Sequence, residues 1–215
     1  DGMNVCLSLM RTVSIPPFDR MSKISSYYSM RDIFADPMIQ VFMKVVAADG
    51  TVSYDGRLQY EYPAVKPVPL IDATFVLENW PRECQCVFQL WETEDVQPHD
   101  DYAYRHNGVL VTTDRAIHAN ESFFADLELI PTFRRVRGRL TCNYIDTLMA
   151  ELEQEGYRNE FNLFPVVKAD RSGLNKRHPF VKDLYRQAHQ MLKFVLTNQF
   201  KRMYREDEML LDISD

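Results

Sequence analysis

The stretch LFPVVKADRSGLNKRHPFVKDLYRQAHQML, residues 163–192, decides the fold that we expect. Its apolar, β-branched beginning (163–169) predicts a strand. Pro179 then opens a helix whose apolar residues recur every three or four positions. Between them lies the cationic segment 170–179, in which Gly173 permits a tight turn. A glycine turn before a helix N-terminus presents N–H groups to an anion, so this segment is a candidate phosphate contact. An ordinary solvated strand-to-helix connection is the competing interpretation.

The segments that precede this stretch indicate the rest of the fold. Alternation of apolar and polar residues predicts four further strands, over 70–79, 84–92, 108–114 and 136–142. Asn143 is expected to cap a helix over 144–155, because a short polar side chain there can accept from the first helical N–H groups. The order of these elements predicts an α+β fold, a mostly antiparallel sheet with two helices packed on one face.

The first third of the chain predicts a separate unit. Two β-branched segments, 38–47 and 51–62, flank Asp49-Gly50, which is typical of a β-hairpin, and a second pair, Asp55-Gly56, predicts another turn. Three prolines in 63–69 favour an extended boundary. We therefore expect three parts: an N-terminal extension or the remainder of an upstream domain, the main α+β domain, and an acidic tail, over 1–69, 70–202 and 203–215. Because the chain begins with Asp1-Gly2, we expect a fragment of a longer protein.

Composition excludes several classes of protein. Of the 215 residues, 46% are hydrophobic and 12% aromatic, which supports a packed core rather than disorder. The formal net charge of −6 argues against a protein that wraps nucleic acid, although a local basic patch could still contact it. No apolar run is long enough to span a membrane, and no signal peptide opens the chain. These features predict a protein without a membrane partner, and the reduced thiols described next predict an intracellular one.

Catalytic and metal-binding motifs are missing from the sequence. Cys84 and Cys86 are two apart, so a strand would place them on one face, too close for an unstrained disulfide and without a C-x-x-C partner. We interpret them as reduced core thiols and expect no metal site. The five histidines show no metal-ligand spacing, and neither a phosphate-binding loop nor a G-x-S-x-G turn is present. The chain alone is therefore not expected to be an active enzyme.

A basic run, FRRVRGRLT (133–141), offers a second kind of site. In a strand, Arg135, Arg137 and Arg139 would share one face and form a cationic stripe. Such a stripe could hold phosphate groups or nucleic acid, and the competing interpretation is an exposed strand face paired with acids.

Three stretches together resemble the transducer domain of the GHKL ATPases: HNGVLVTTDRAIH (106–118), PTFRRVRGRLTCNYIDTLM (131–149) and FPVVKADRSGLNKRHPFVKDLYRQAHQMLKF (164–194). This superfamily includes the ATPase subunit of gyrase, MutL, the 90-kilodalton heat-shock chaperone and the microrchidia proteins. The resemblance covers about residues 70–200. It implies a left-handed βαβ crossover and a cation that reaches the γ-phosphate of ATP in a neighbouring domain, which couples nucleotide state to conformational change.

The resemblance also implies roles for single residues. By position, Arg171 is the first candidate for the catalytic cation and Lys176 the second, while Gly173 and Asn175 are candidate cofactor-binding residues of the same loop. ATP and Mg²⁺ would be bound mainly by an upstream ATP-binding domain, because the family's Glu-and-Asn helix and its Asp-x-Gly-x-Gly loop do not occur in this sequence. A second copy of the chain is a further expected partner.

The alternative function belongs to another class. A non-enzymatic nucleic-acid- or protein-binding module would use Arg135, Arg137 and Arg139. Phosphate binding through such a stripe must weaken steeply with salt. A γ-phosphate contact within an ATPase has no need to bind nucleic acid at all, so salt dependence separates the two functions.

Overall fold

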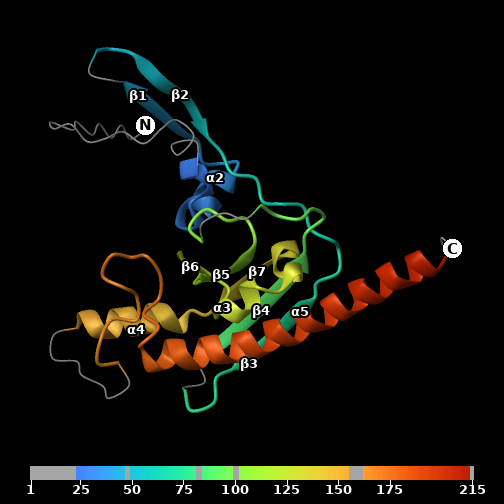
Figure 1. Ribbon diagram of the computed structural model, residues 1–215. Coiled ribbons are helices and arrows are strands. Elements are labelled where there is room, and N and C mark those ends of the chain that lie inside the picture. The colour runs from blue at the N-terminus through green and yellow to red at the C-terminus, as the bar shows by residue number, and fades with distance from the viewer. Residues whose placement is uncertain (1–22, 47–48, 81–83, 99–101, 155–161, 214–215) are drawn as a thin grey trace.

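The computed structural model describes residues 23–46, 49–80, 84–98, 102–154 and 162–213. Its centre is a five-stranded sheet with the strand order β3-β4-β7-β5-β6 (Figure 1). All neighbours in this sheet are antiparallel except β5 and β7, which run parallel. The strands are β3 (Ile71–Val76), β4 (Gln85–Glu92), β5 (Gly108–Thr112), β6 (Ile117–Glu121) and β7 (Val136–Thr141).

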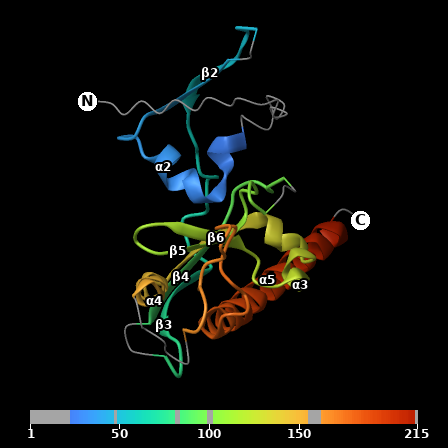
Figure 2. The same cartoon turned by 90° about the vertical axis from the view of Figure 1, so that its left-hand side faces the viewer.

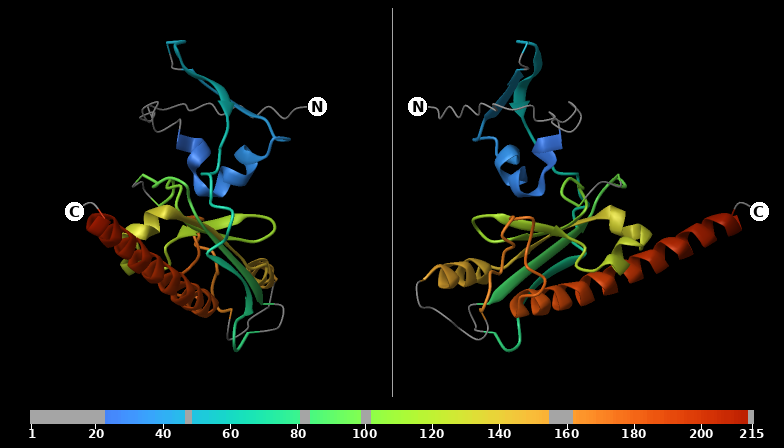
Figure 3. Two further views of the ribbon diagram at one scale, coloured as in Figure 1. Left: turned by 90° about the vertical axis from the view of Figure 1, so that its right-hand side faces the viewer. Right: turned by 60° about the vertical axis from the view of Figure 1, so that its left-hand side comes forward.

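One face of this sheet is apolar and carries both long helices. The inward side chains of β4 and β7 are fully buried, among them Phe88, Leu90 and Leu140. They join one core with residues of α4 (Tyr144–Glu153) and the first part of α5 (Pro179–Ile213). Figure 3 shows α5 on the side of the sheet that faces away from the N-terminal segment. Along α5, buried residues recur every three or four positions: Val181, Leu184, Ala188, Leu192 and Leu196.

The N-terminal segment, described over residues 23–46 and 49–62, covers the opposite face. It contains short helical turns, η1 (Lys23–Ser26), η2 (Tyr28–Met30) and α2 (Arg31–Ala35), followed by a hairpin of β1 (Val41–Val46) and β2 (Val52–Leu58). Figure 2 shows it across the sheet from α5. The buried ring of Tyr28 packs in a cluster with Leu110 of β5 and Ile117 of β6. Since the helices cover one face of the sheet and this segment covers the other, β5 is buried on both faces.

Two further connections lie in the second half of the described chain. The short helices α3 (Ala125–Glu128) and η3 (Pro131–Arg135) lead from β6 to β7. Residues 162–178 form a loop that leads into α5, and their only ladder contact among the described residues is an isolated bridge between Val167 and Leu174.

The coarse fold predicted from the sequence is confirmed: the chain is α+β, with a mostly antiparallel, mixed sheet and two helices on one face. The hairpin around Asp49-Gly50 is also confirmed. Helix α5 continues to Ile213 and so includes most of the predicted acidic tail. In the described part of the chain, no helix combines the length and the hydrophobicity needed to cross a membrane.

Three local predictions are wrong. The predicted strand 163–169 is a loop, because its backbone bonds close on the following turn: the Lys168 N–H donates to the Gly173 carbonyl oxygen at 3.0 Å. The predicted turn at Asp55-Gly56 lies inside β2, where both residues pair with β1. Asn143 does not cap α4, since its side chain instead bonds Asp114 at 2.6 and 2.9 Å.

Gly138 is the tightest point of the central strand. A Cβ added there would lie 2.7 Å from the Gln89 carbonyl oxygen and 2.8 Å from a methyl carbon of Leu90. We expect Gly138→Ala to lower the free energy of unfolding by roughly 1–3 kcal/mol, because the β4–β7 ladder has to move apart. Urea unfolding measures this change. The control is Gly56→Ala, whose methyl would first meet the Tyr54 side chain, at 3.3 Å from the hydroxyl oxygen. Equal losses in both variants would contradict the close approach at Gly138.

Candidate functional site

The loop before α5 is ordered by its own polar groups. The Ser172 N–H donates to the Asp170 carboxylate at 3.0 Å, and the Arg171 N–H donates to the Lys168 carbonyl oxygen at 2.9 Å. At the far end, the Asn175 N–H donates to the Val166 carbonyl oxygen at 2.7 Å. These bonds form a closed turn that holds residues 168–175 in one arrangement without a sheet partner.

Arg171 combines a constrained backbone with an exposed side chain. Its φ of 55° lies in the left-handed region, which costs a non-glycine residue roughly 1–2 kcal/mol. Its carbonyl oxygen accepts a hydrogen bond from the Tyr28 hydroxyl at 3.2 Å. Burial raises the pKa of Tyr28, so this hydroxyl remains a donor at neutral pH. Within the described residues the Arg171 guanidinium makes no hydrogen bond or ion pair, and it faces solvent.

Lys176 lies in the same loop but has a partner. Its ammonium is 2.9 Å from the Glu121 carboxylate at the end of β6, and it lies over the Tyr185 ring. Tyr185 also donates to Glu121, at 3.1 Å. The Lys176 side chain is 56% exposed, whereas the Glu121 side chain is 14% exposed. An anion that draws Lys176 away would therefore leave a largely buried carboxylate with the Tyr185 hydroxyl as its remaining described partner.

The other two predicted residues hold the shape of the loop. Gly173 has a φ of 140°, so the turn there favours glycine, although a Cβ would meet only the Ala119 side chain at 3.9 Å. The Asn175 amide donates to the Pro165 carbonyl oxygen at 3.1 Å and accepts from the Arg177 N–H at 3.1 Å. The structure thus brings all four predicted residues into one loop, with Arg171 and Lys176 as the outward cations.

His178 is a positioning residue that the sequence analysis did not select. It is fully buried and directly precedes α5, where its Nδ1 accepts from the Phe180 N–H at 3.2 Å in the manner of a helix cap. The Nε2–H therefore donates to Asn162, 3.2 Å away. Burial lowers the pKa of His178, which keeps the ring neutral. In the sequence, the signal for this role was a histidine directly before Pro179, the residue that opens the helix.

The three arginines of the predicted stripe do not form one open row. Arg135 is the last residue of η3, outside the strand, while Arg137 and Arg139 lie on β7. Both strand arginines are half-buried and face the N-terminal segment. The guanidinium of Arg139 binds the Asp32 carboxylate at 2.7 and 3.0 Å, and that of Arg137 lies over the Tyr62 ring, 4.5 Å from its centroid.

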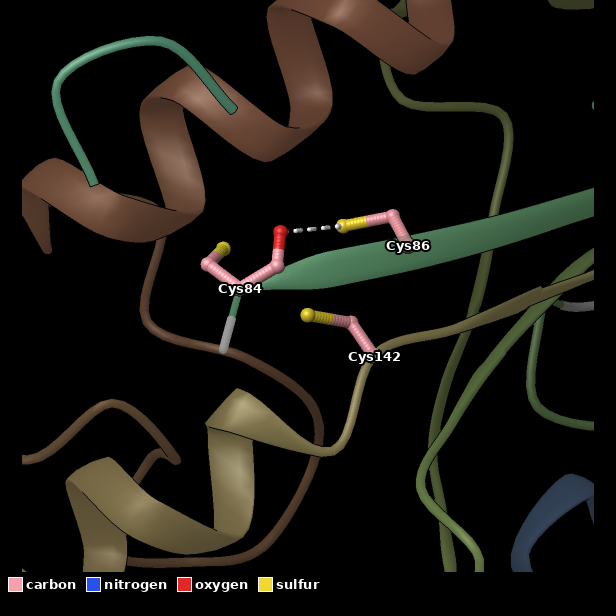
Figure 4. Close-up of side chains that lie close together, drawn as sticks. All are labelled: Cys84, Cys86 and Cys142. Carbon is pink, nitrogen blue, oxygen red and sulfur yellow. Dashed lines mark hydrogen bonds between the residues drawn. The ribbon is translucent and has the colours of Figure 1, made fainter. Parts of the chain in front are cut away.

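Three cysteines lie close together where β4 begins and β7 ends, as Figure 4 shows. Cys84 and Cys86 belong to the β4 side and Cys142 follows β7, with all three sulfur atoms within 4.8 Å of one another. The prediction of Cys84 and Cys86 as free core thiols is confirmed, and Cys142 is a third. Hydrogen bonds from Cys84 and Cys86 lower the pKa of Cys142, aided by the N–H groups at the start of α4. Three thiols suit a soft metal ion, but a structural zinc site needs a fourth ligand, which no other His, Cys, Asp or Glu in the described chain adds to this cluster.

Comparison with known proteins adds no relative. No protein-family model matches the sequence, and no curated protein or solved structure shows significant similarity to the chain. The chemistry of the loop therefore has to be argued from its geometry and from the sequence resemblance. That chemistry is the presentation of a guanidinium that is unpaired among the described residues, on a braced backbone, together with a second cation that is paired with Glu121.

The buried ring of His178 predicts a loss of stability in mild acid. Its folded-state pKa is lowered, so its contribution is complete above the unfolded value of about 6.5 and is lost as pH falls from there toward the folded pKa. We expect His178→Asn, which can cap the helix without titrating, to lose less stability than the native chain between pH 7.5 and 5.5. Urea unfolding at both values measures this.

His118 has to be separated from His178 in that experiment. Burial also lowers the pKa of His118, although the nearby Asp146 carboxylate opposes this. The double variant His118→Asn/His178→Asn should therefore show a smaller pH dependence than either single variant. An unchanged loss of stability in His178→Asn would refute the contribution of His178 to the pH dependence.

Proposed function

We propose that this chain is a transducer-like segment of a larger GHKL-type ATPase, in which the loop 168–178 supplies a cation to the γ-phosphate of ATP. ATP and Mg²⁺ are held mainly by an ATP-binding domain outside this chain. The observation that carries the proposal is the Arg171 guanidinium, which is exposed and, among the described residues, unpaired, on a turn braced by Asp170 and Tyr28.

The physical basis is electrostatic stabilisation of phosphoryl transfer. Negative charge spreads over the equatorial oxygens of the transferring group, and a cation already in position lowers the free energy of that state. Arg171 needs no ion pair to be broken before it acts, whereas Lys176 first has to leave Glu121. This difference ranks Arg171 first and Lys176 second. Gly173 and Asn175 support both by fixing the turn, in keeping with their proposed place beside the nucleotide.

The left-handed βαβ crossover of the family is part of this proposal. In the described sheet, β5 and β7 are the one parallel pair, and the chain between them passes through β6, α3 and η3. After α4, where the resemblance expects another strand, the chain offers the Val167–Leu174 bridge. An intracellular location and pairing with a second copy of the chain also remain proposals, since both derive from the sequence and from the family.

The alternative, a nucleic-acid- or protein-binding module, has weaker geometric support. Two of its three arginines are half-buried beneath the N-terminal segment, and Arg139 already has an anionic partner in Asp32. A duplex or single strand approaching β7 would have to displace this segment first. We therefore favour the transducer function.

Substitution of the loop cations tests the proposal. In the full-length protein, we expect Arg171→Ala to lower kcat for ATP hydrolysis by roughly 10- to 1,000-fold, since one electrostatic donor is lost from the transition state. Lys176→Ala should have a smaller effect. Steady-state ATP turnover and thermal unfolding are measured side by side. Lys201→Ala, an exposed cation near the other end of α5, is the control. Unchanged turnover in both loop variants would refute the proposal.

Tyr28→Phe tests whether the backbone of Arg171 has to be held. The variant removes only the hydroxyl that donates to the Arg171 carbonyl oxygen. We expect kcat to fall, while KM for ATP changes little, because the cation is displaced from the reacting phosphate but the nucleotide is bound elsewhere. A change in KM alone would indicate that Tyr28 supports nucleotide binding rather than the position of Arg171.

A further inference from the structure

A cationic pocket lies between the sheet and the N-terminal segment. Its volume is about 160 Å³, and its walls come from α2, β4, β5, β6 and β7 together with Tyr62, His106 and Asn107. Three guanidinium groups line it, those of Arg31, Arg137 and Arg139. The pocket is on the sheet face opposite α4 and α5, and it is separate from the outward cations of the loop.

The positive charge of this pocket exceeds its negative charge. Arg139 is paired with Asp32, whose pKa burial raises but hydrogen bonds from Arg139 and Tyr62 lower more. Arg31 is 1% exposed and donates to the carbonyl oxygens of Ser26 and Arg105, neither of which carries a charge. Among the described residues, three guanidinium groups thus meet one bound carboxylate, an excess of two positive charges.

Arg137 shows most clearly that the pocket lacks negative charge. Its Nη1 atom is buried and has no hydrogen-bond partner within the described chain, and the guanidinium is held in place by stacking on Tyr62. Burial lowers the pKa of both Arg31 and Arg137, which reflects the cost of keeping these charges away from water. Arginine does not deprotonate in proteins, so both charges persist, and an anion between them would offset the cost of their burial.

The other nearby acids are already engaged. Glu128 pairs with Arg105 at 2.6 Å, on the β6 side of the pocket. Asp72 is exposed and accepts from the Gln89 amide at 3.2 Å. Both carboxylates therefore have partners other than Arg31 and Arg137.

We propose that this pocket binds one small oxyanion, a phosphate or a group of the same chemistry such as sulfate, between Arg31 and Arg137. Guanidinium groups match such oxygens in geometry as well as in charge. At roughly 30 Å³ per water molecule, the volume equals about five waters, enough for one phosphate group but not for a whole nucleotide. The anion would link α2 to β7 and so fasten the N-terminal segment to the sheet.

Thermal unfolding of the full chain in inorganic phosphate tests this site. Against chloride at equal ionic strength, we expect a saturable rise of the melting temperature in the native protein and none in Arg137→Met. Arg135→Met is the matched control, since Arg135 is two residues away, on η3, and is not part of the pocket wall. It should keep the full response to phosphate.

Two further measurements distinguish this site from a general effect of salt. Without oxyanion, Arg137→Met should be at least as stable as the native chain, because it removes a buried charge that lacks a partner. Arg137→Lys, which keeps the charge, should keep a weaker response and serves if the Met variant does not fold. Isothermal titration with inorganic phosphate and with glycerol phosphate separates free phosphate from a phosphate group on a larger molecule.

The proposal is overturned if phosphate stabilises Arg135→Met and Arg137→Met equally, or if the native chain shows neither a melting shift nor heat of binding. Binding of glycerol phosphate alone would assign the pocket to a phosphorylated ligand, and binding of both would assign it to the phosphate group itself. The ATPase readout is not used, so failure of this site leaves the proposed role of Arg171 untouched.

Discussion

The covering of β7 on both faces, complete on one and partial on the other, is the constraint on which the rest of the structure depends. Val136 and Leu140 face the helices, while Arg137 and Arg139 face the N-terminal segment. A central strand can keep two arginines only if other groups shield and balance them, because a buried charge without a partner is costly. Tyr62 shields Arg137 and Asp32 balances the charge of Arg139, and both residues belong to the N-terminal segment. The N-terminal segment is thus required by the chemistry of β7.

The same segment also supports the loop before α5. Within one turn of chain, Tyr28 holds the backbone of Arg171 and Arg31 enters the cationic pocket. Two sites that are far apart in the sequence are therefore fixed by neighbouring residues of η2 and α2. The brace on Arg171 matters because its left-handed backbone would relax without external contacts.

Elements with a strong local period could be predicted from the sequence, and elements that depend on partners could not. The alternation in β4 and the helical stripe of α5 identify both, since each period reports one buried face. The run 163–169 has the residue types of a strand but no neighbour to pair with, and periodicity cannot show that. The candidate loop was found from its composition. The burial of Arg137 and Arg139 was not, because the covering residues lie 75 or more positions away.

The two cationic sites differ in what burial does to them. Arg171 is exposed, so water screens its charge until another domain or a nucleotide excludes the solvent. Arg137 is held in a partly desolvated site from the start, where an anion is attracted strongly even before any domain closes. A charge that acts only when domains close suits a switch. A charge that is already desolvated suits an anion site that is occupied constantly. Under the two proposals, the loop would make a contact that depends on domain closure, whereas the pocket beneath the N-terminal segment would hold its anion constantly.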